Sequence, residues 1–284
     1  MKLSKIASIK RGQDGAIHDG LLFRFDIKGV GSVYDLSKQN TEAIDLPPIA
    51  EFTLDGADIV VPHSNAVVFS TEYFEEGDEF PILFSNVYNN YAKEEDKKVG
   101  VAAAYRIWKE GERFLSKLLG TVEIGFTSDR ELWRSAGETA DVRPYGNFVI
   151  DKDASKYYAF VMRDGERKTR FFRFSLPNIK NATPNGDGLR RIILEKEAIE
   201  DYFDTPYHNY MQGAVCHGGK IYSVEGFHEK IHPAIRIIDL AKKEEETFFD
   251  FFEAGFIHEP ELIDFLDEKC IYSDAVGNLF HLEI

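Results

Sequence analysis

The sequence predicts an all-β fold made of five repeated units, and three observations support this prediction. The apolar runs alternate with polar residues or are β-branched, the chain is rich in Phe (23) and Tyr (13), and one aromatic motif recurs along its length. Alternation with β-branched and aromatic residues is typical of strands, whereas a helix repeats about every 3.6 residues. Recurrence at a regular spacing indicates a fold assembled from similar units.

The recurring motif is a bulky apolar residue followed by an aromatic one, and Ser or Ala follows the pair in four of the five copies. Successive copies lie 50 to 74 residues apart, close to one fifth of the 284-residue chain. We interpret each copy as the second strand of a unit. The copies are Leu22-Phe23, Leu83-Phe84, Tyr157-Tyr158, Ile221-Tyr222 and Ile271-Tyr272.

Two further runs accompany each copy. The run before it begins with a polar residue and continues with apolar ones, which predicts first strands at 13–17, 65–69, 147–150, 212–215 and 261–263. The run after it has two apolar or small residues, one polar residue and one apolar residue, at 33–36, 104–107, 171–174, 237–240 and 279–282. This pattern is typical of a half-buried strand that pairs through a hairpin with the preceding strand.

Fourth strands are predicted at 49–54, 115–124, 191–194 and 246–251. The last unit has none, because the sequence stops at Ile284, and the unassigned run 3–9 can supply it. Five four-stranded antiparallel units closed in a ring describe a five-bladed β-propeller, with the N-terminal strand completing the last blade.

We expect one propeller domain over residues 1–284, because no Pro-, Gly- or Ser-rich linker divides the chain. The predicted blades span about 13–60, 61–140, 141–205, 206–257, and 258–284 plus 1–12. The alternatives are a pair of β-sandwiches or a propeller with another number of blades.

The composition limits the partners and the compartment. The formal charge of −15 argues against nucleic acid and anionic membranes as partners, because both would be repelled. The first ten residues contain no apolar run of signal-peptide length, which predicts a cytoplasmic protein. Two cysteines, Cys216 and Cys270, are too few for a disulfide framework, and we expect them to fill strands.

Several segments resemble a bacterial group of five-bladed propeller proteins of uncharacterised function. The resemblance spans essentially the whole chain and is carried by the openings at Gln13 and Gln212, by His63-Ser-Asn65, and by the segment 78–84. It implies the fold and no particular activity. The sequence does not match the catalytic carboxylates of arabinanase-like propellers or the repeats of propeller lectins, so no site is transferred from either.

The predicted ring brings the starts of the five first strands to one mouth of the central channel. Polar residues open these strands, namely Gln13, Asn65, Asn147, Gln212 and Glu261. A cationic or titratable residue precedes each opener, namely Arg11, His63, Arg143, His208 and His258. Because Arg can bind a carboxylate or phosphate through two hydrogen bonds, this set predicts a binding module for a small anionic or polyhydroxylated, carbohydrate-like ligand.

Four alternatives remain open for the same residues. The polar openers could serve only to satisfy backbone groups along the channel. The three histidines could bind a divalent metal, with Glu72 or Glu259 completing the ligand set. Glu72, Glu259, Glu261 and Asp264 could act as the acid and base of a carbohydrate-active hydrolase or lyase. Finally, the charged insert 88–98 could serve a protein-interaction scaffold. The sequence assigns no cofactor and no catalytic residue.

Overall fold

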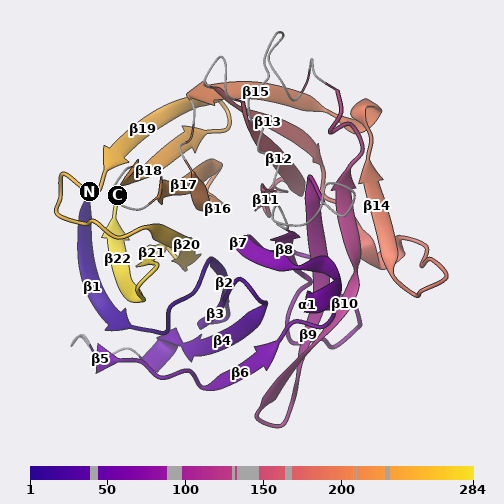
Figure 1. The fold of residues 1–284 in the computed structure, drawn as a ribbon, viewed down its shortest axis with the longest axis horizontal. Coiled ribbons are helices and arrows are strands. Elements are labelled where there is room, and N and C mark those ends of the chain that lie inside the picture. The colour runs from indigo at the N-terminus through magenta and orange to yellow at the C-terminus, as the bar shows by residue number, and fades with distance from the viewer. Residues whose placement is uncertain are drawn as a thin grey trace.

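The computed structural model describes residues 1–38, 44–87, 98–129, 132, 147–163, 168–206, 208, 210–227 and 231–284. Its strands form five sheets arranged around one axis, as Figure 1 shows. The five-bladed β-propeller predicted from the sequence is therefore confirmed. No helix in the described ranges is long and apolar enough to cross a membrane.

Blade 1 has the strand order β2-β3-β4-β6, with β2 innermost. Each strand pairs antiparallel with the next, so the blade is a simple meander. Its strands and the short helices around it are β2 (Gly15–His18), β3 (Leu21–Phe25), β4 (Val30–Asp35), η1 (Leu36–Lys38), β6 (Ala50–Thr53) and α1 (Ala57–Val60).

Blades 3 and 4 follow the same plan in the orders β11-β12-β13-β15 and β16-β17-β18-β19. The strands of blade 3 are β11 (Phe148–Asp151), β12 (Lys156–Arg163), β13 (Lys168–Ser175) and β15 (Asp201–Pro206), with η3 (Ile179–Asn181) and η4 (Lys196–Ala198) between the last two. Those of blade 4 are β16 (Met211–His217), β17 (Lys220–Phe227), β18 (Ile231–Asp239) and β19 (Glu244–Asp250).

Blade 5 is completed by the N-terminal strand, as predicted. Strand β1 (Lys2–Ser8) pairs antiparallel with β22 (Asn278–Glu283), and the two termini lie side by side in Figure 1. The remaining strands of this sheet are β20 (Pro260–Leu266), β21 (Lys269–Asp274) and β5 (Ile44–Asp45), the last of which pairs parallel with β1. The pairing of β1 with β22 closes the ring, because separating these two strands would expose the backbone groups of both.

Blade 2 contains an outer strand that the sequence analysis placed incorrectly. Its strands are β7 (Pro62–Phe69), β8 (Leu83–Val87), β9 (Val101–Glu110) and β10 (Arg113–Ile124). Strand β14 (Arg190–Leu194), predicted as the fourth strand of blade 3, instead pairs parallel with β10 as a fifth strand of blade 2. Strand β15 takes the predicted place in blade 3. An apolar run predicts a strand but not the sheet that it joins, since both edges offer the same backbone groups.

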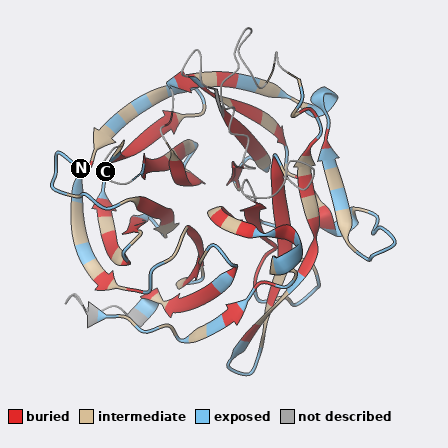
Figure 2. Cartoon of the chain, in the orientation of Figure 1, coloured by how far each residue is buried: buried red, intermediate tan, exposed pale blue. Residues whose placement is uncertain are grey.

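The core consists of five apolar clusters, one between each pair of neighbouring blades. Figure 2 shows burial along the inner strands and exposure on the outer strands β14 and β19. Cys216 and Cys270 are both buried and unpaired, in agreement with the prediction that they fill strands. The packed clusters fix the five inner strands relative to one another, and these strands carry the candidate site.

Candidate functional site

The first residues of the inner strands meet across blade boundaries. Gln13, before β2, donates from Nε2 to Glu261 Oε1 in β20 at 3.2 Å. Gln212 in β16 donates from Nε2 to Glu259 Oε1 at 2.6 Å and to the Gly226 carbonyl at 3.0 Å. These contacts link blade 4 to blade 5 and blade 5 to blade 1 at the predicted end of the channel.

A second group links blades 2 and 3 through Asn86 in β8. Its Oδ1 accepts the backbone N–H of Asn65 at 2.9 Å, and its Nδ2 donates to Asn147 Oδ1 at 3.2 Å. The same amide nitrogen also donates to the Asn65 side chain. Four of the five predicted openers lie within two residues of an inner-strand start, whereas Asn65 is the fourth residue of β7, and all five take part in these contacts.

Asp14 joins blade 1 to blade 2 and is completely buried. Its Oδ2 accepts the backbone N–H of Val67 in β7 at 3.0 Å. Gly213 in blade 4 also approaches closely, since a Cβ there would lie 3.2 Å from Asp14 Oδ1 and 2.8 Å from the Glu261 carbonyl oxygen. Only Gly permits this approach of backbone to side chain, so the channel is narrow at this level.

Three buried polar atoms of this region have no hydrogen-bond partner within the described part of the chain: Asp14 Oδ1, Glu261 Oε2 and Asn147 Nδ2. Their residues are at most 2% exposed. A buried polar group without a partner costs about 1–3 kcal/mol, so most buried polar groups in proteins are satisfied. The region therefore retains two acceptor positions and one donor position that no described residue fills.

Burial also changes the acidity of the two carboxyl groups. It raises the pKa of Asp14 well above the ordinary 3.8 and the pKa of Glu261 well above 4.5. The nearby charge of Glu259 further raises the pKa of Glu261. Both groups hold a proton more tightly than an exposed carboxylate, and a protonated carboxyl can donate as well as accept a hydrogen bond.

The residues predicted to supply positive charge do not gather at these openers. Arg11 and His258 are exposed. His63 is partly buried, and burial lowers its pKa to about 4, so its imidazole is neutral near pH 7. Arg143 lies outside the described residues.

His208 is fully buried between blades 3 and 4 rather than at the openers. Its Nε2 lies 3.2 Å from Thr205 Oγ1, its backbone N–H donates to Thr169 Oγ1 at 3.1 Å, and its ring meets Phe171 edge to face. Burial lowers the pKa of this imidazole well below 6.5. His208 therefore serves as a neutral link between two blades.

The metal alternative finds no support in the described ranges, where no group of three or more His, Cys, Asp or Glu is placed to hold an ion. Of the proposed additional ligands, Glu72 accepts a hydrogen bond from Asn178 at 2.7 Å. Glu259 is engaged by Gln212. Asp264, which was a candidate acid or base and not a metal ligand, accepts the backbone N–H of Ile17 at 2.6 Å, and this contact ties blade 5 to blade 1.

Asp14 and Arg24 belong to this region but were missed as candidates. Arg24 is buried in β3 and occupies the position after the aromatic motif, where the other four blades have Ser or Ala. It donates to the Ser273 hydroxyl, the residue at the same position of blade 5. The sequence does mark Arg24, because it is the one charged residue at a motif position that is Ser or Ala in the other four copies. Asp14 directly follows the opener Gln13, and no separate pattern in the sequence marks it.

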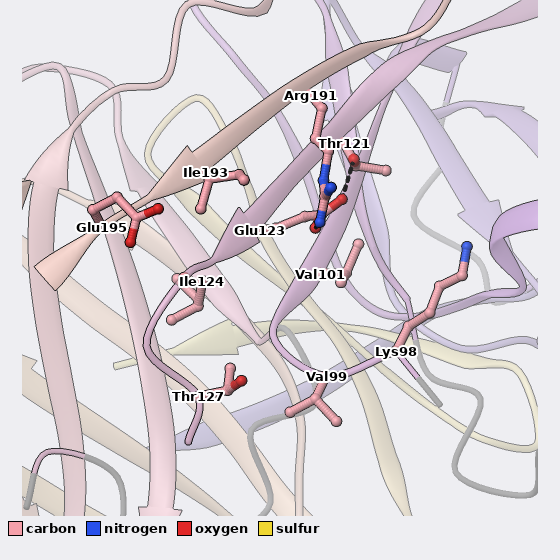
Figure 3. Close-up of a pocket in the computed structure, with 11 residues that line it drawn as sticks. Lys98, Val99, Val101, Thr121, Glu123, Ile124, Thr127, Arg191, Ile193 and Glu195 are labelled. Carbon is pink, nitrogen blue, oxygen red and sulfur yellow. Dashed lines mark hydrogen bonds and ion pairs between the residues drawn. The ribbon is translucent and has the colours of Figure 1, made fainter. Parts of the chain in front are cut away.

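A further cavity lies on the outer part of blade 2, away from the inner strands. Figure 3 shows this cavity of about 690 Å³ between β10 and β14, with Val99, Val101 and Ile193 among its lining side chains. The Glu123 carboxylate in this cavity already has partners, because it accepts hydrogen bonds from the Thr121 hydroxyl and the Arg191 guanidinium. The sequence analysis did not predict this cavity, which exists because β14 extends the sheet of blade 2.

Comparison with known proteins yields similarity in structure only. No family model matches the chain, and no curated protein matches it. A glutaminyl cyclase from Myxococcus xanthus aligns over 98% of this chain and 97% of its own, with 12% identity and a TM-score of 0.46. Sqt1 from Saccharomyces cerevisiae aligns over 94% of this chain and 57% of its own, with 7% identity and a TM-score of 0.38.

A computationally designed protein, Ika8, covers 99% of both chains, with 9% identity and a TM-score of 0.37. At these identities a match concerns the fold and transfers no residue role. The five-bladed propeller follows from the strand order of this chain itself, and the role of its site follows from its own residues.

Proposed function

We propose that the protein is a binding module for a small polyhydroxylated, carbohydrate-like ligand, held where the inner strands begin. One observation carries the proposal: Asp14 Oδ1, Glu261 Oε2 and Asn147 Nδ2 are buried and have no partner within the described chain. A hydroxyl group both donates and accepts hydrogen bonds. Hydroxyl groups of a ligand can therefore satisfy both kinds of atom, the carboxyl oxygens and the amide nitrogen.

The charges of the region favour a neutral polyol over an anion. Glu259 and Glu261 stand at the start of β20, and Asp14 lies next to them in blade 1. Of the predicted cations in the described chain, Arg11 and His258 are exposed and His208 is buried elsewhere. Arg24 is the one buried cation beside Asp14 and Glu261 in the described chain, so an anionic ligand would meet three carboxyl groups against one guanidinium, which costs free energy.

A carbohydrate-active hydrolase is the second candidate, and the environment of Glu261 favours it. Burial and the charge of Glu259 raise the pKa of Glu261, as a general acid requires. Glycosidases commonly use two carboxyl groups whose environments separate their pKa values. Glu261 would then donate the proton and Glu259 would act as the base or nucleophile.

The test is thermal unfolding with a panel of neutral sugars, uronates and divalent cations. A neutral sugar should raise the melting temperature, because a ligand that binds only the folded state stabilises it. Glu261→Gln and Asn147→Ala should each reduce this rise, whereas Glu268→Gln, with a side chain 92% exposed, should leave it unchanged. Chromatography of the incubated sugar separates the candidates, since only an enzyme would consume it.

Two results would contradict the proposal. One is a panel in which no neutral sugar changes the melting temperature of the wild type. The other is a rise that persists in full in both Glu261→Gln and Asn147→Ala.

A further inference from the structure

A separate small cavity of about 100 Å³ lies at the seam where the chain passes from blade 5 into blade 1. Lys10 and Arg11, which connect β1 to β2, form one side of it. Arg24 of β3 and Tyr34 of β4 are among the residues on the other side. The cavity therefore adjoins both the strand that closes the ring and the blade that follows it.

Arg24 brings a buried positive charge to this seam. Its Nη2 donates to the carbonyl oxygens of Gly12 and Asp274, both at 2.8 Å, and its Nη1 donates to the Ser273 hydroxyl. All three acceptors are neutral, and Nε has no partner within the described chain. Burial lowers the pKa of this guanidinium, and the nearby charges of Glu261, Asp274 and Asp14 raise it. What Arg24 can offer an anion is therefore the unpartnered Nε donor.

Two other residues that line the same cavity have hydrogen-bond donors, namely Arg11 and Tyr34. Arg11 is exposed and makes no hydrogen bond or ion pair with any residue that the structure describes. The Tyr34 hydroxyl accepts the backbone N–H of Lys10 at 3.1 Å, and its own hydrogen has no acceptor in the described ranges. The cavity is therefore lined by hydrogen-bond donors without an acceptor in the described chain, on Arg11, Arg24 and Tyr34.

The carboxylates of the lining are already occupied. Glu51 accepts hydrogen bonds from Lys10 Nζ at 2.5 Å and from Ser32 Oγ at 3.0 Å. Asp26 accepts the backbone N–H groups of Lys28 and Val30 at 2.8 and 2.9 Å. With Lys10, Arg11 and Arg24 against Asp26 and Glu51, the lining has a formal charge of +1 in a chain of −15.

We propose that this cavity binds a tetrahedral oxyanion of the size of phosphate, held by Arg11, Arg24 and Tyr34. Filled acceptors, unused donors and a net positive lining all favour an anion, and arginine binds phosphate oxygens through its planar array of donors. Because Arg11 follows the closing strand and Arg24 reaches Ser273 in blade 5, the bound anion also holds the ring closed. Asp14, Asn147 and Glu261, which carry the carbohydrate proposal, do not line this cavity, so each proposal can fail without the other.

Thermal unfolding in inorganic phosphate, at ionic strength matched with chloride, tests the proposal. The melting temperature of the wild type should rise with phosphate concentration. Arg11→Gln should weaken phosphate binding about tenfold or more, as measured by calorimetry. Because Arg11 is exposed, this variant should fold normally. Arg113→Gln is the matched control, since its side chain is 76% exposed on blade 2 and its loss should leave phosphate binding unchanged.

Tyr34→Phe provides a second variant that removes one donor and little volume, and it should also weaken phosphate binding. Glycerol phosphate distinguishes the two sources of the anion: tighter binding than inorganic phosphate assigns the cavity to a phosphate group on a larger molecule, and equal binding assigns it to the free ion. The proposal is wrong if phosphate does not stabilise the wild type beyond chloride, or if Arg11→Gln binds phosphate as tightly as Arg113→Gln does.

Discussion

Gln13 and Glu261 are 248 residues apart in sequence, yet the Gln13 amide donates to the Glu261 carboxyl group across 3.2 Å. The contact exists because β1 completes the last blade and delivers the chain directly to the first strand of blade 1. Closure of the ring and assembly of the candidate site are therefore one structural event.

Disruption of the closing strand should destabilise the whole ring. Ala7 is 3% exposed and lies between β22 and β5, within the apolar cluster of blades 5 and 1. Ala7→Asp should lower the free energy of unfolding by about 3 kcal/mol or more, because a charge would be buried without a partner. Urea denaturation measures the loss. Lys2→Gln, at an exposed position of the same strand, removes only a surface ion pair with Glu283 and should cost less than about 1 kcal/mol. Equal losses in the two variants would argue against closure by β1.

Acidic pH should favour the wild type relative to Asp14→Asn. Burial raises the pKa of Asp14 above the ordinary 3.8, so the folded state holds this proton more tightly than the unfolded state does. The stabilisation is complete below the ordinary pKa and is lost as the pH rises through the higher folded value. Between pH 4 and neutral pH, the free energy of unfolding of the wild type should fall relative to that of Asp14→Asn. If the free energy of unfolding of the wild type instead rises relative to that of Asp14→Asn over this pH range, the pKa of Asp14 is lowered in the folded protein and the prediction is wrong.

A buried ion pair in blade 4 should be costly to break. Arg236 donates to Glu225 through Nε and Nη2 at 3.0 and 2.9 Å, and their side chains are 10% and 3% exposed. Glu225→Ala should destabilise the fold by about 2 kcal/mol, because the guanidinium loses two buried hydrogen bonds but keeps the one that Nη1 donates to Glu245. The double variant Glu225→Ala, Arg236→Met should cost less than the sum of the single changes. Additive losses in denaturant titrations would indicate that the pair is not coupled.

The added fifth strand of blade 2 should depend on one glycine. A Cβ at Gly120 in β10 would lie 1.9 Å from the carbonyl oxygen of Arg190 in β14. Gly120→Ala should therefore separate β14 from β10 and accelerate amide hydrogen exchange over 190–194. Gly111→Ala is the control, because its φ of +64° costs about 1 kcal/mol but no atom lies within 4 Å of the new Cβ. Equal rates of amide hydrogen exchange over 190–194 in the two variants would contradict the pairing of β14 with β10 at Gly120.

The strand order could largely be predicted from sequence, because each blade repeats a polar opener, an aromatic pair and a half-buried third strand. The run 191–194 was misassigned because its register with β10 depends on close backbone approach at Gly120, which composition does not reveal. Gln13, Asn147, Gln212 and Glu261 lie within two residues of an inner-strand start, and Asn65 lies inside β7; their role in binding stays a prediction.

Side-chain direction was the part that could not be predicted. His208 precedes β16 by a few residues and turns into the blade interface, where Thr205 and Thr169 satisfy it. Arg11 faces the seam cavity instead of the openers. Position relative to a strand predicts which end of the channel a residue occupies, but the direction of its side chain depends on partners from other blades.

Calorimetric titration of the wild type and of Glu261→Gln with a neutral sugar identified by the thermal panel tests the central claim most directly. The account predicts measurable heat of binding in the wild type and at least about tenfold weaker binding in Glu261→Gln, since a hydrogen-bonded carboxyl group contributes on the order of 1.5 kcal/mol or more. Unchanged affinity in Glu261→Gln would place any bound sugar away from the starts of the inner strands and contradict the proposed site.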